Sequence, residues 1–265
     1  MYELQYTKPS NTTSAVAEFD KSQEGKYLAG GMTLIPTLKA RLATSDLLID
    51  LKDSNLSGIS VTSTNVVIGS MTRHCDVASS VDIKKSIPSL AKLAGGIGDH
   101  MVRNCGTMGG SVANNDPSAC YPSAVLALDA TITTNMRSIS SEDYFIGMFE
   151  TALNSNEIIT QITFPIPDKS TYIKFPNPAS RYAMVGVFMA KTGNKVNVAI
   201  TGASENGVFR SSEIENALSS SCTLESLDTL SISSDGLISD IHASSNYRAN
   251  LIKEMAKRAL KEIIT

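Results

Sequence analysis

The sequences Ala29-Gly30-Gly31-Met32-Thr33 and Cys105-Gly106-Thr107-Met108-Gly109-Gly110-Ser111 each contain two adjacent glycines, and the two pairs stand roughly 80 residues apart. Both pairs interrupt stretches that otherwise look ordered. Because glycine has no Cβ, backbone amides at both places can come close to a ligand. Two such segments in one domain suit a dinucleotide, which has one diphosphate and two long ends to position. The pattern therefore predicts a diphosphate-binding cleft.

The first glycine segment stands between a short predicted strand and a predicted helix. Lys26-Tyr27-Leu28 precedes it, and the apolar spacing of residues 34–42 suits a helix with Pro36 in its first turn. Unpaired N–H groups and the positive end of the helix dipole favour phosphate oxygens at such a point, and the Thr33 hydroxyl can add a hydrogen bond. A single glycine pair is also common in plain turns, so the prediction depends on the second segment.

The second glycine segment lies in an unusually glycine-rich region. Gly95, Gly96 and Gly98 precede it, and the run Val112-Ala113-Asn114-Asn115-Asp116-Pro117 follows it. This region offers donors and acceptors at high density, which is typical of chain that surrounds a ligand.

Composition narrows the class of protein. The chain has 265 residues, of which 42% are hydrophobic and 18% are charged, as is ordinary for a soluble globular protein. The formal net charge is −3, and the 23 Lys and Arg residues form no dense basic run. We therefore expect no nucleic acid among its partners.

The N-terminus and the longest apolar runs bear on location. Residues 1–6 have neither a basic region nor an apolar core of the kind that leader peptides carry, and no run approaches the roughly 18 apolar residues of a membrane helix. We expect a cytoplasmic protein with no membrane span.

Cysteine and histidine spacing gives no metal or hydrolytic signature. No two of the four cysteines form a CxxC pair, so we expect no metal ligand in the chain, and any iron–sulfur cluster must belong to another chain. His74, His100 and His242 are scattered and show no nucleophile–histidine pattern. Cys105 and Cys120 flank the second glycine segment, either as thiols near a ligand or as small buried apolar residues.

The order of predicted elements indicates an α+β fold with two domains. Predicted strands lie at residues 2–6, 27–29, 47–51, 130–134 and 157–164, a hairpin at 61–69, and helices at 14–22 and 122–128. Pro165 and Pro167 end the last of these strands. Predicted antiparallel strands at 172–175, 186–191 and 195–202 follow, then a serine-rich stretch at 219–245 and an amphipathic helix at 246–264.

The motifs, taken in this order, resemble those of the FAD-binding medium subunit of the molybdenum hydroxylases. That family includes carbon monoxide dehydrogenase, aldehyde oxidoreductases and the flavin domain of xanthine dehydrogenase. Besides the two glycine segments, the resemblance rests on Ala113-Asn114-Asn115-Asp116-Pro117-Ser118-Ala119, on Tyr172-Ile173-Lys174-Phe175 and on Pro178-Ala179-Ser180-Arg181-Tyr182. It extends over essentially the whole chain.

The resemblance implies a fold and a division of the chain. It implies a two-lobed FAD-binding domain of the PCMH type at residues 1–167, with lobes at about 1–57 and 58–167. A smaller α/β C-terminal domain of the molybdenum hydroxylase flavoprotein type, with an antiparallel sheet and helices, would occupy residues 168–265.

The resemblance also assigns cofactor-binding residues. Residues 29–33 and 106–110 would wrap the FAD diphosphate, and Asn114 and Asp116 would lie near the dinucleotide. Ile159 would be an apolar contact to the adenine or flavin end, Lys174 would reach the polar edge of the flavin, and Tyr182 would lie against its ring. The residues so assigned are Ala29, Gly30, Gly31, Met32, Thr33, Gly106, Thr107, Met108, Gly109, Gly110, Asn114, Asp116, Ile159, Lys174 and Tyr182.

The implied function is electron transfer within a larger complex, of the carbon monoxide or aldehyde oxidising type. A partner large subunit would carry the molybdenum cofactor and a partner small subunit two [2Fe-2S] clusters, and FAD would pass electrons on to an external acceptor. No residue of this chain is assigned a catalytic role. The first glycine segment contains no histidine, which favours noncovalent FAD.

Two positions depart from the family pattern, and alternatives stay open. Ser111 stands where the family commonly has Asn, and Cys120 stands where it commonly has Asp. These departures make a flavin-free scaffold or assembly subunit conceivable. A nicotinamide-dependent or stand-alone flavin reductase is the other alternative, although the G-x-G-x-x-G sequence of a dinucleotide-binding βαβ unit is not present.

Overall fold

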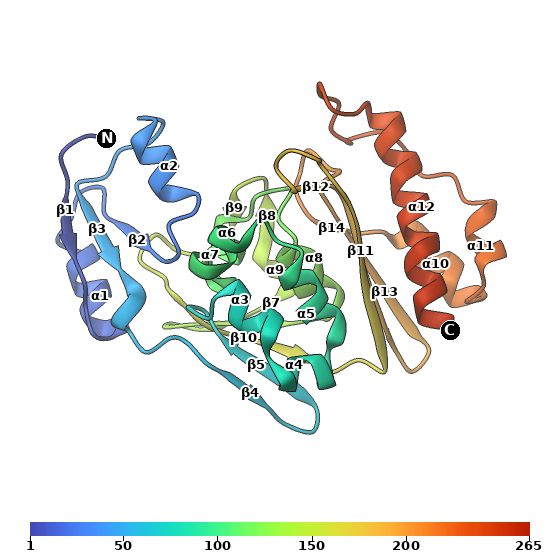
Figure 1. Cartoon of the computed structure of the whole chain (residues 1–265), viewed down its shortest axis with the longest axis horizontal. Coiled ribbons are helices and arrows are strands. Elements are labelled where there is room, and N and C mark those ends of the chain that lie inside the picture. The colour runs from blue at the N-terminus through green and yellow to red at the C-terminus, as the bar shows by residue number, and fades with distance from the viewer.

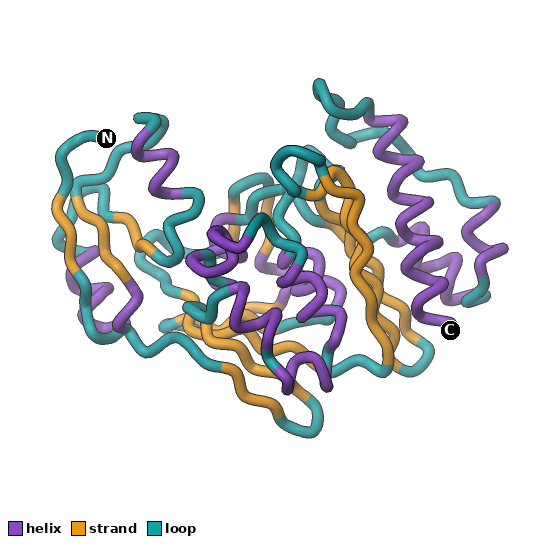
Figure 2. Tube along the Cα trace, in the orientation of Figure 1, coloured by secondary structure: helices purple, strands orange, loops and turns teal.

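The computed structural model describes all residues from 1 to 265, and the chain forms three consecutive parts along its long axis (Figure 1). Figure 2 shows that each part contains both strands and helices. The fold is mixed α+β, as predicted from the sequence.

The N-terminal part is a small parallel sheet with the strand order β1-β3-β2. Leu47, Leu48 and Ile49 of the central strand are all buried, as is usual for a strand covered on both faces. The elements of this part are β1 (Gln5–Thr7), α1 (Thr12–Phe19), β2 (Lys26–Leu28), α2 (Leu34–Lys39), β3 (Leu47–Asp50) and a 3-10 turn at Leu51–Asp53.

The middle part is an antiparallel sheet with the order β4-β5-β10-β6-β7, covered by short helices. Its strands are β4 (Ile59–Val61), β5 (Asn65–Gly69), β6 (Thr131–Thr134), β7 (Ser138–Ser140) and β10 (Ile159–Pro165), with a separate hairpin of β8 (Phe145–Gly147) and β9 (Glu150–Thr151). Its helices are α3 (His74–Ser79), α4 (Val81–Ser86), α5 (Pro88–Gly95), α6 (His100–Cys105), α7 (Met108–Asn114), α8 (Tyr121–Ala127) and α9 (Ser141–Tyr144).

The C-terminal part is a four-stranded antiparallel sheet with helices on its outer face. Eight consecutive residues of β12, from Ala183 to Ala190, are buried, because helices cover both faces of the sheet. The elements are β11 (Lys169–Pro176), β12 (Ala183–Thr192), β13 (Lys195–Thr201), β14 (Phe209–Arg210), α10 (Ser212–Ser220), α11 (Leu224–Asp228) and α12 (Ser245–Ile264).

The apolar cores do not follow the three parts strictly. The largest core lies between the middle sheet and its helices, and it also includes Tyr172, Phe188 and Ala199 from the C-terminal sheet. The opposite face of that sheet packs on α10 and α12 in a second core. The C-terminal sheet is therefore shared between two cores.

Several predicted elements shift once the tertiary contacts are known. The first strand begins at Gln5 instead of residue 2, because its pairing with β3 starts there. Helix α1 begins at Thr12, since the Asn11 side chain caps it by accepting from Ser14 N. The largest difference concerns the second glycine segment, which forms the first turn of α7.

Candidate functional site

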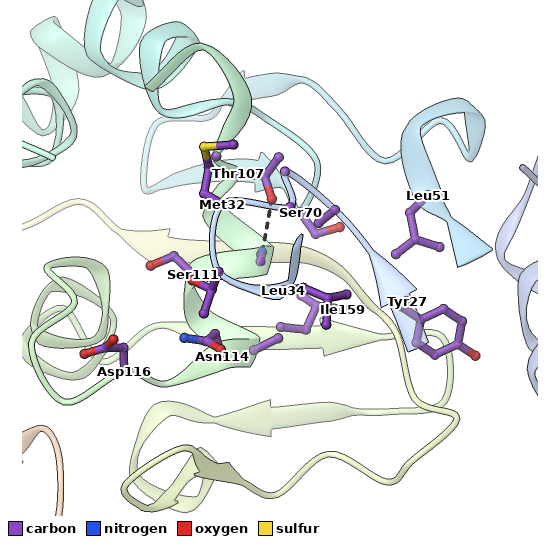
Figure 3. Close-up of a pocket in the computed structure, with 18 of the residues that line it drawn as sticks. Tyr27, Met32, Leu34, Leu51, Ser70, Thr107, Ser111, Asn114, Asp116 and Ile159 are labelled. Atoms are coloured by element: carbon purple, nitrogen blue, oxygen red, sulfur yellow. Dashed lines mark hydrogen bonds between the residues drawn. The ribbon is translucent and has the colours of Figure 1, made fainter. Parts of the chain in front are cut away.

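A cavity of ≈ 930 Å³ lies where the N-terminal and middle parts meet, and it reaches the loop between β11 and β12 of the C-terminal sheet. This volume is at the upper end of the range for small-molecule sites, which suits an extended ligand. Figure 3 shows Tyr27 and Asp116 near opposite ends of the drawn site, with both glycine segments between them.

The first glycine segment presents a row of free backbone donors to the cavity. No N–H of residues 30–33 donates a hydrogen bond within the chain. Gly31 has φ +70°, a left-handed conformation that favours glycine. Helix α2 starts directly after these residues, so its dipole adds to the positive potential of the free amides. Such a row of amides is typical of a site for phosphate oxygens.

The second glycine segment uses most of its amides within the protein. The N–H groups of Met108 and Gly109 donate to Thr72 O and Ser70 O, at 3.0 and 2.8 Å. The Thr107 side chain caps α7 by accepting from Gly110 N at 3.1 Å, the bond drawn dashed in Figure 3. The expectation of free backbone therefore fits the first segment better than the second.

The glycines of both segments allow backbone to pack on backbone. A Cβ on Gly30 would lie 2.3 Å from the carbonyl oxygen of Cys105, and one on Gly109 would lie 2.8 Å from that of Ser70. A Cβ on Gly106 would lie 2.6 Å from His74 Nε2. The first of these approaches brings the two segments together, and the other two bring the second segment against Ser70 and His74.

Most residues singled out from the sequence meet in this cavity. Those that line it are Ala29, Gly30, Gly31, Met32, Thr33, Gly106, Thr107, Gly109, Gly110, Asn114, Asp116, Ile159 and Tyr182. Met108 and Lys174 do not line it. Met108 is completely buried in the largest core, and Lys174 Nζ donates to Gly96 O and Arg181 O, at 2.7 and 3.0 Å.

Asp116 and Tyr182 lie together at one end of the cavity. Burial raises the pKa of Asp116, while a hydrogen bond from Ser118 N at 2.8 Å opposes the rise. Burial, followed by the charge of Asp116, raises the pKa of Tyr182. Tyr182 is still 47% exposed, so its ring stands at the rim as a planar surface that another ring can cover.

Several residues that line the cavity have no role assigned from the sequence. The stacked rings of Phe19 and Tyr27, with centroids 5.0 Å apart, border the other end of the cavity. Ser70 and His74 also line it, and the buried atoms Ser70 Oγ and His74 Nδ1 have no hydrogen-bond partner. Only their position just after a predicted strand end could have drawn attention to Ser70 and His74.

The residues present fit FAD. A diphosphate carries oxygens for the free amides of residues 30–33, and the unpartnered Ser70 Oγ can donate to another polar atom of a ligand. The cavity has an aromatic group at each end for the two ring systems of the cofactor. Ser111 and Cys120, which depart from the family pattern, both line the same cavity.

The fold and this cavity define a nucleotide-binding α+β protein, and comparison with known proteins identifies its family. The family model described as "FAD binding domain in molybdopterin dehydrogenase" matches residues 2–167. The chain belongs to this family of FAD-binding medium subunits of molybdopterin dehydrogenases.

The similarity to known relatives covers nearly the whole chain. The glyceraldehyde dehydrogenase medium chain of Sulfolobus acidocaldarius is 32% identical and covers 98% of both chains. The carbon monoxide dehydrogenase medium chain of Hydrogenophaga pseudoflava is 30% identical over 97% of this chain and 96% of its own. A solved Cu,Mo-CO dehydrogenase superposes with a TM-score of 0.88 at 28% identity, covering 98% of this chain and 96% of the other.

Two further features of the chain concern membranes and metals. None of its helices combines the length and apolar character needed to cross a membrane. Its His, Cys, Asp and Glu side chains form no group of three or more that could hold a metal ion.

Proposed function

We propose that this chain is the FAD-binding electron-transfer subunit of a heteromeric molybdenum hydroxylase of the carbon monoxide or aldehyde oxidising type. A large subunit with the molybdenum cofactor and a small iron–sulfur subunit would be its partners, and electrons would leave through FAD to an external acceptor. FAD suits this role because it can take up electrons singly or in pairs. The row of unpaired amides at residues 30–33 carries the proposal.

Each end of the cavity would hold one part of the noncovalent cofactor. We assign the diphosphate to the amides of residues 30–33 and to the N-terminal turn of α7, and the isoalloxazine to the end with Asp116 and Tyr182. The stacked pair Phe19 and Tyr27 would border the adenosine. Lys174 would not contact the flavin directly. Its ammonium would hold the Arg181 carbonyl, which borders the flavin end of the cavity.

We further propose that residues 1–167 form the FAD-binding unit, with lobes at about 1–57 and 58–167, and that residues 168–265 form a cover at the flavin end. The change from the middle sheet to the C-terminal sheet between Pro165 and Lys169 supports this division. A cytoplasmic location stays a prediction.

The partners' substrate does not follow from this chain. The relatives are named for glyceraldehyde, carbon monoxide and nicotine, although their identities to this chain differ only between 28% and 32%. This spread supports a division of labour in which substrate selection belongs to the molybdenum subunit.

Reconstitution with FAD tests the proposal and separates it from the scaffold alternative. The purified chain is incubated with FAD, freed of excess cofactor and scanned in the visible range. We expect flavin bands at roughly 370 and 450 nm in the protein fraction. A folded chain that retains no flavin, alone or with its copurified partners, would favour the scaffold.

A pair of variants tests the place of the diphosphate. Ser111 lines the cavity one turn into α7, and its hydroxyl makes no hydrogen bond within the chain. Ser111→Asp adds a negative charge facing the diphosphate, so we expect at least about tenfold weaker FAD binding, equivalent to about 1.4 kcal/mol. In Ser111→Asn the new side chain has nearly the size of aspartate but no charge, so this variant should bind FAD within about threefold of the wild type. Equal affinities of the two variants would place the diphosphate elsewhere.

A further inference from the structure

A thiol and an amine meet beside the cavity at the start of α8. Cys120 is only 5% exposed, yet it lines the cavity. Its Sγ lies 3.6 Å from Nζ of Lys174 on β11. The Lys174 ammonium also donates to Gly96 O and Arg181 O, so the amine is held in place next to the sulfur.

An unused hydroxyl completes this group. Tyr172 lies two residues before Lys174 on β11, so both side chains leave the same face of the strand. The Tyr172 hydroxyl is buried and has no hydrogen-bond partner in the chain. Burial, followed by the neighbouring Cys120 thiol, raises the pKa of Tyr172. The hydroxyl therefore stays protonated and remains available as a donor to an oxygen on that sulfur.

We propose that Cys120 and Lys174 form a covalent sulfur–nitrogen link when the chain meets hydrogen peroxide. In the first step the peroxide O–O bond breaks, one oxygen bonds to Cys120 sulfur, and water leaves. The sulfur is oxidised by two electrons to a sulfenic acid, and the peroxide is reduced. In the second step the Lys174 ammonium first gives one proton to solvent, and the lone pair of the resulting amine bonds to sulfur as the S–O bond breaks. A second proton passes from the nitrogen to the departing hydroxyl, which leaves as water.

The structure favours Cys120 over the other thiols for this chemistry. Cys105 and Cys222 have no hydrogen-bond partner of their own, and Cys75 Sγ contacts the Asp76 carboxylate at 3.5 Å. Only Cys120 has a lysine amine at contact distance, with the neighbouring Tyr172 hydroxyl to hold the sulfenic oxygen. The link would remove one positive charge from this end of the cavity and would tie α8 to β11.

Peptide mapping of the full-length wild-type chain tests the link. The chain, without added FAD, is treated with a small excess of hydrogen peroxide, its remaining thiols are blocked, and it is digested with trypsin. We expect the Cys120 and Lys174 peptides to appear joined, two hydrogens lighter than their sum, and to separate on reduction with dithiothreitol. The exposed Cys105 serves as the internal control and should be oxidised without joining a lysine peptide.

Two variants test the roles of Lys174 and Tyr172 in forming the link. In Lys174→Arg the amine is replaced, so Cys120 should proceed to sulfinic acid instead of forming a link. In Tyr172→Phe the link should form several-fold more slowly. In the wild type, sulfinic Cys120 beside a free Lys174 peptide would overturn the proposal. So would an unreacted Cys120 when Cys105 is fully oxidised. Because this decisive reading uses only the wild type and needs no flavin, it is independent of variant folding and of the proposed function.

Discussion

Single residues decide how closely the segments around the cavity can approach one another. Gly95 and Gly109 are both helical, but only Gly109 lies against another backbone. At Gly109 an added Cβ would lie 2.4 Å from Ser70 Cβ and 2.8 Å from Ser70 O, whereas at Gly95 the nearest atom would be Ala78 Cβ at 3.8 Å. The same substitution should therefore have opposite effects at the two sites.

We expect Gly95→Ala to stabilise the chain by about 0.5–1 kcal/mol, because alanine has the higher helix propensity. Gly109→Ala should destabilise it by about 1–3 kcal/mol, because the first turn of α7 must move away from Ser70. Urea unfolding followed by circular dichroism measures both changes. A stabilised Gly109→Ala would mean that this helix end is not held against Ser70.

His74 gives the chain a pH dependence at the residue scale. Burial, followed by the charge of Arg103, lowers the pKa of His74 from 6.5 to about 4. Between these two pH values the unfolded chain binds a proton that the folded chain excludes. The free energy of unfolding should therefore fall as the pH decreases from about 6.5 to 4, by up to about 3 kcal/mol.

The His74→Gln variant isolates this contribution, because it removes the titrating group from a site that already has an unpartnered nitrogen. Over pH 6.5 to 5, where most carboxylates remain charged, its free energy of unfolding should fall clearly less than that of the wild type. Parallel pH profiles of the two proteins would contradict the assignment of the dependence to His74.

At the scale of elements, α7 depends on its N-cap. The Thr107 hydroxyl accepts from Gly110 N, and the same turn borders the cavity. We expect Thr107→Val to cost about 1 kcal/mol of stability and to weaken FAD binding, because the turn loses its capping bond. Thr107→Ser keeps the acceptor and should restore most of both losses. Chemical denaturation and FAD titration measure the pair, and a serine variant as weak as valine would show that the methyl group matters instead.

The elements also show what the sequence can and cannot predict. The strands at Lys26–Leu28 and Leu47–Asp50 follow from local patterns, and the structure confirms these two elements. Local patterns did not reveal that the amides of Met108 and Gly109 bond to Thr72 O and Ser70 O in the segment that follows β5. Nor did they show that the Lys174 ammonium donates a hydrogen bond to Gly96 O. Both depend on contacts between segments far apart in the chain, which spacing alone does not encode.

At the scale of the whole molecule, the C-terminal sheet is part of the core that supports the cavity. Phe188 of β12 belongs to the same core as Leu90 of α5 and Val125 of α8. The Thr201 hydroxyl on β13 also donates to the carbonyls of Pro117 and Ala119, at 3.0 and 2.7 Å, just before α8. The chain should therefore unfold with its middle and C-terminal parts coupled.

A fragment of residues 1–167 tests this coupling. Without the C-terminal sheet it exposes the apolar faces of α5 and α8, so we expect it to aggregate or to show no cooperative unfolding transition. Size-exclusion chromatography and denaturation, with the full-length chain as the control, make the comparison. A monomeric fragment that unfolds cooperatively and binds FAD as tightly as the full chain would show that the two parts are independent.

The central claim is that the free amides of the first glycine segment hold the FAD diphosphate. The most direct test is to follow the backbone amide signals of ¹⁵N-glycine-labelled chain by NMR during titration with FAD. We predict that the Gly30 and Gly31 signals move to the positions of hydrogen-bonded amides, while Gly109, already bonded to Ser70 O, keeps its bond. Saturating FAD binding that leaves Gly30 and Gly31 unchanged would contradict the account.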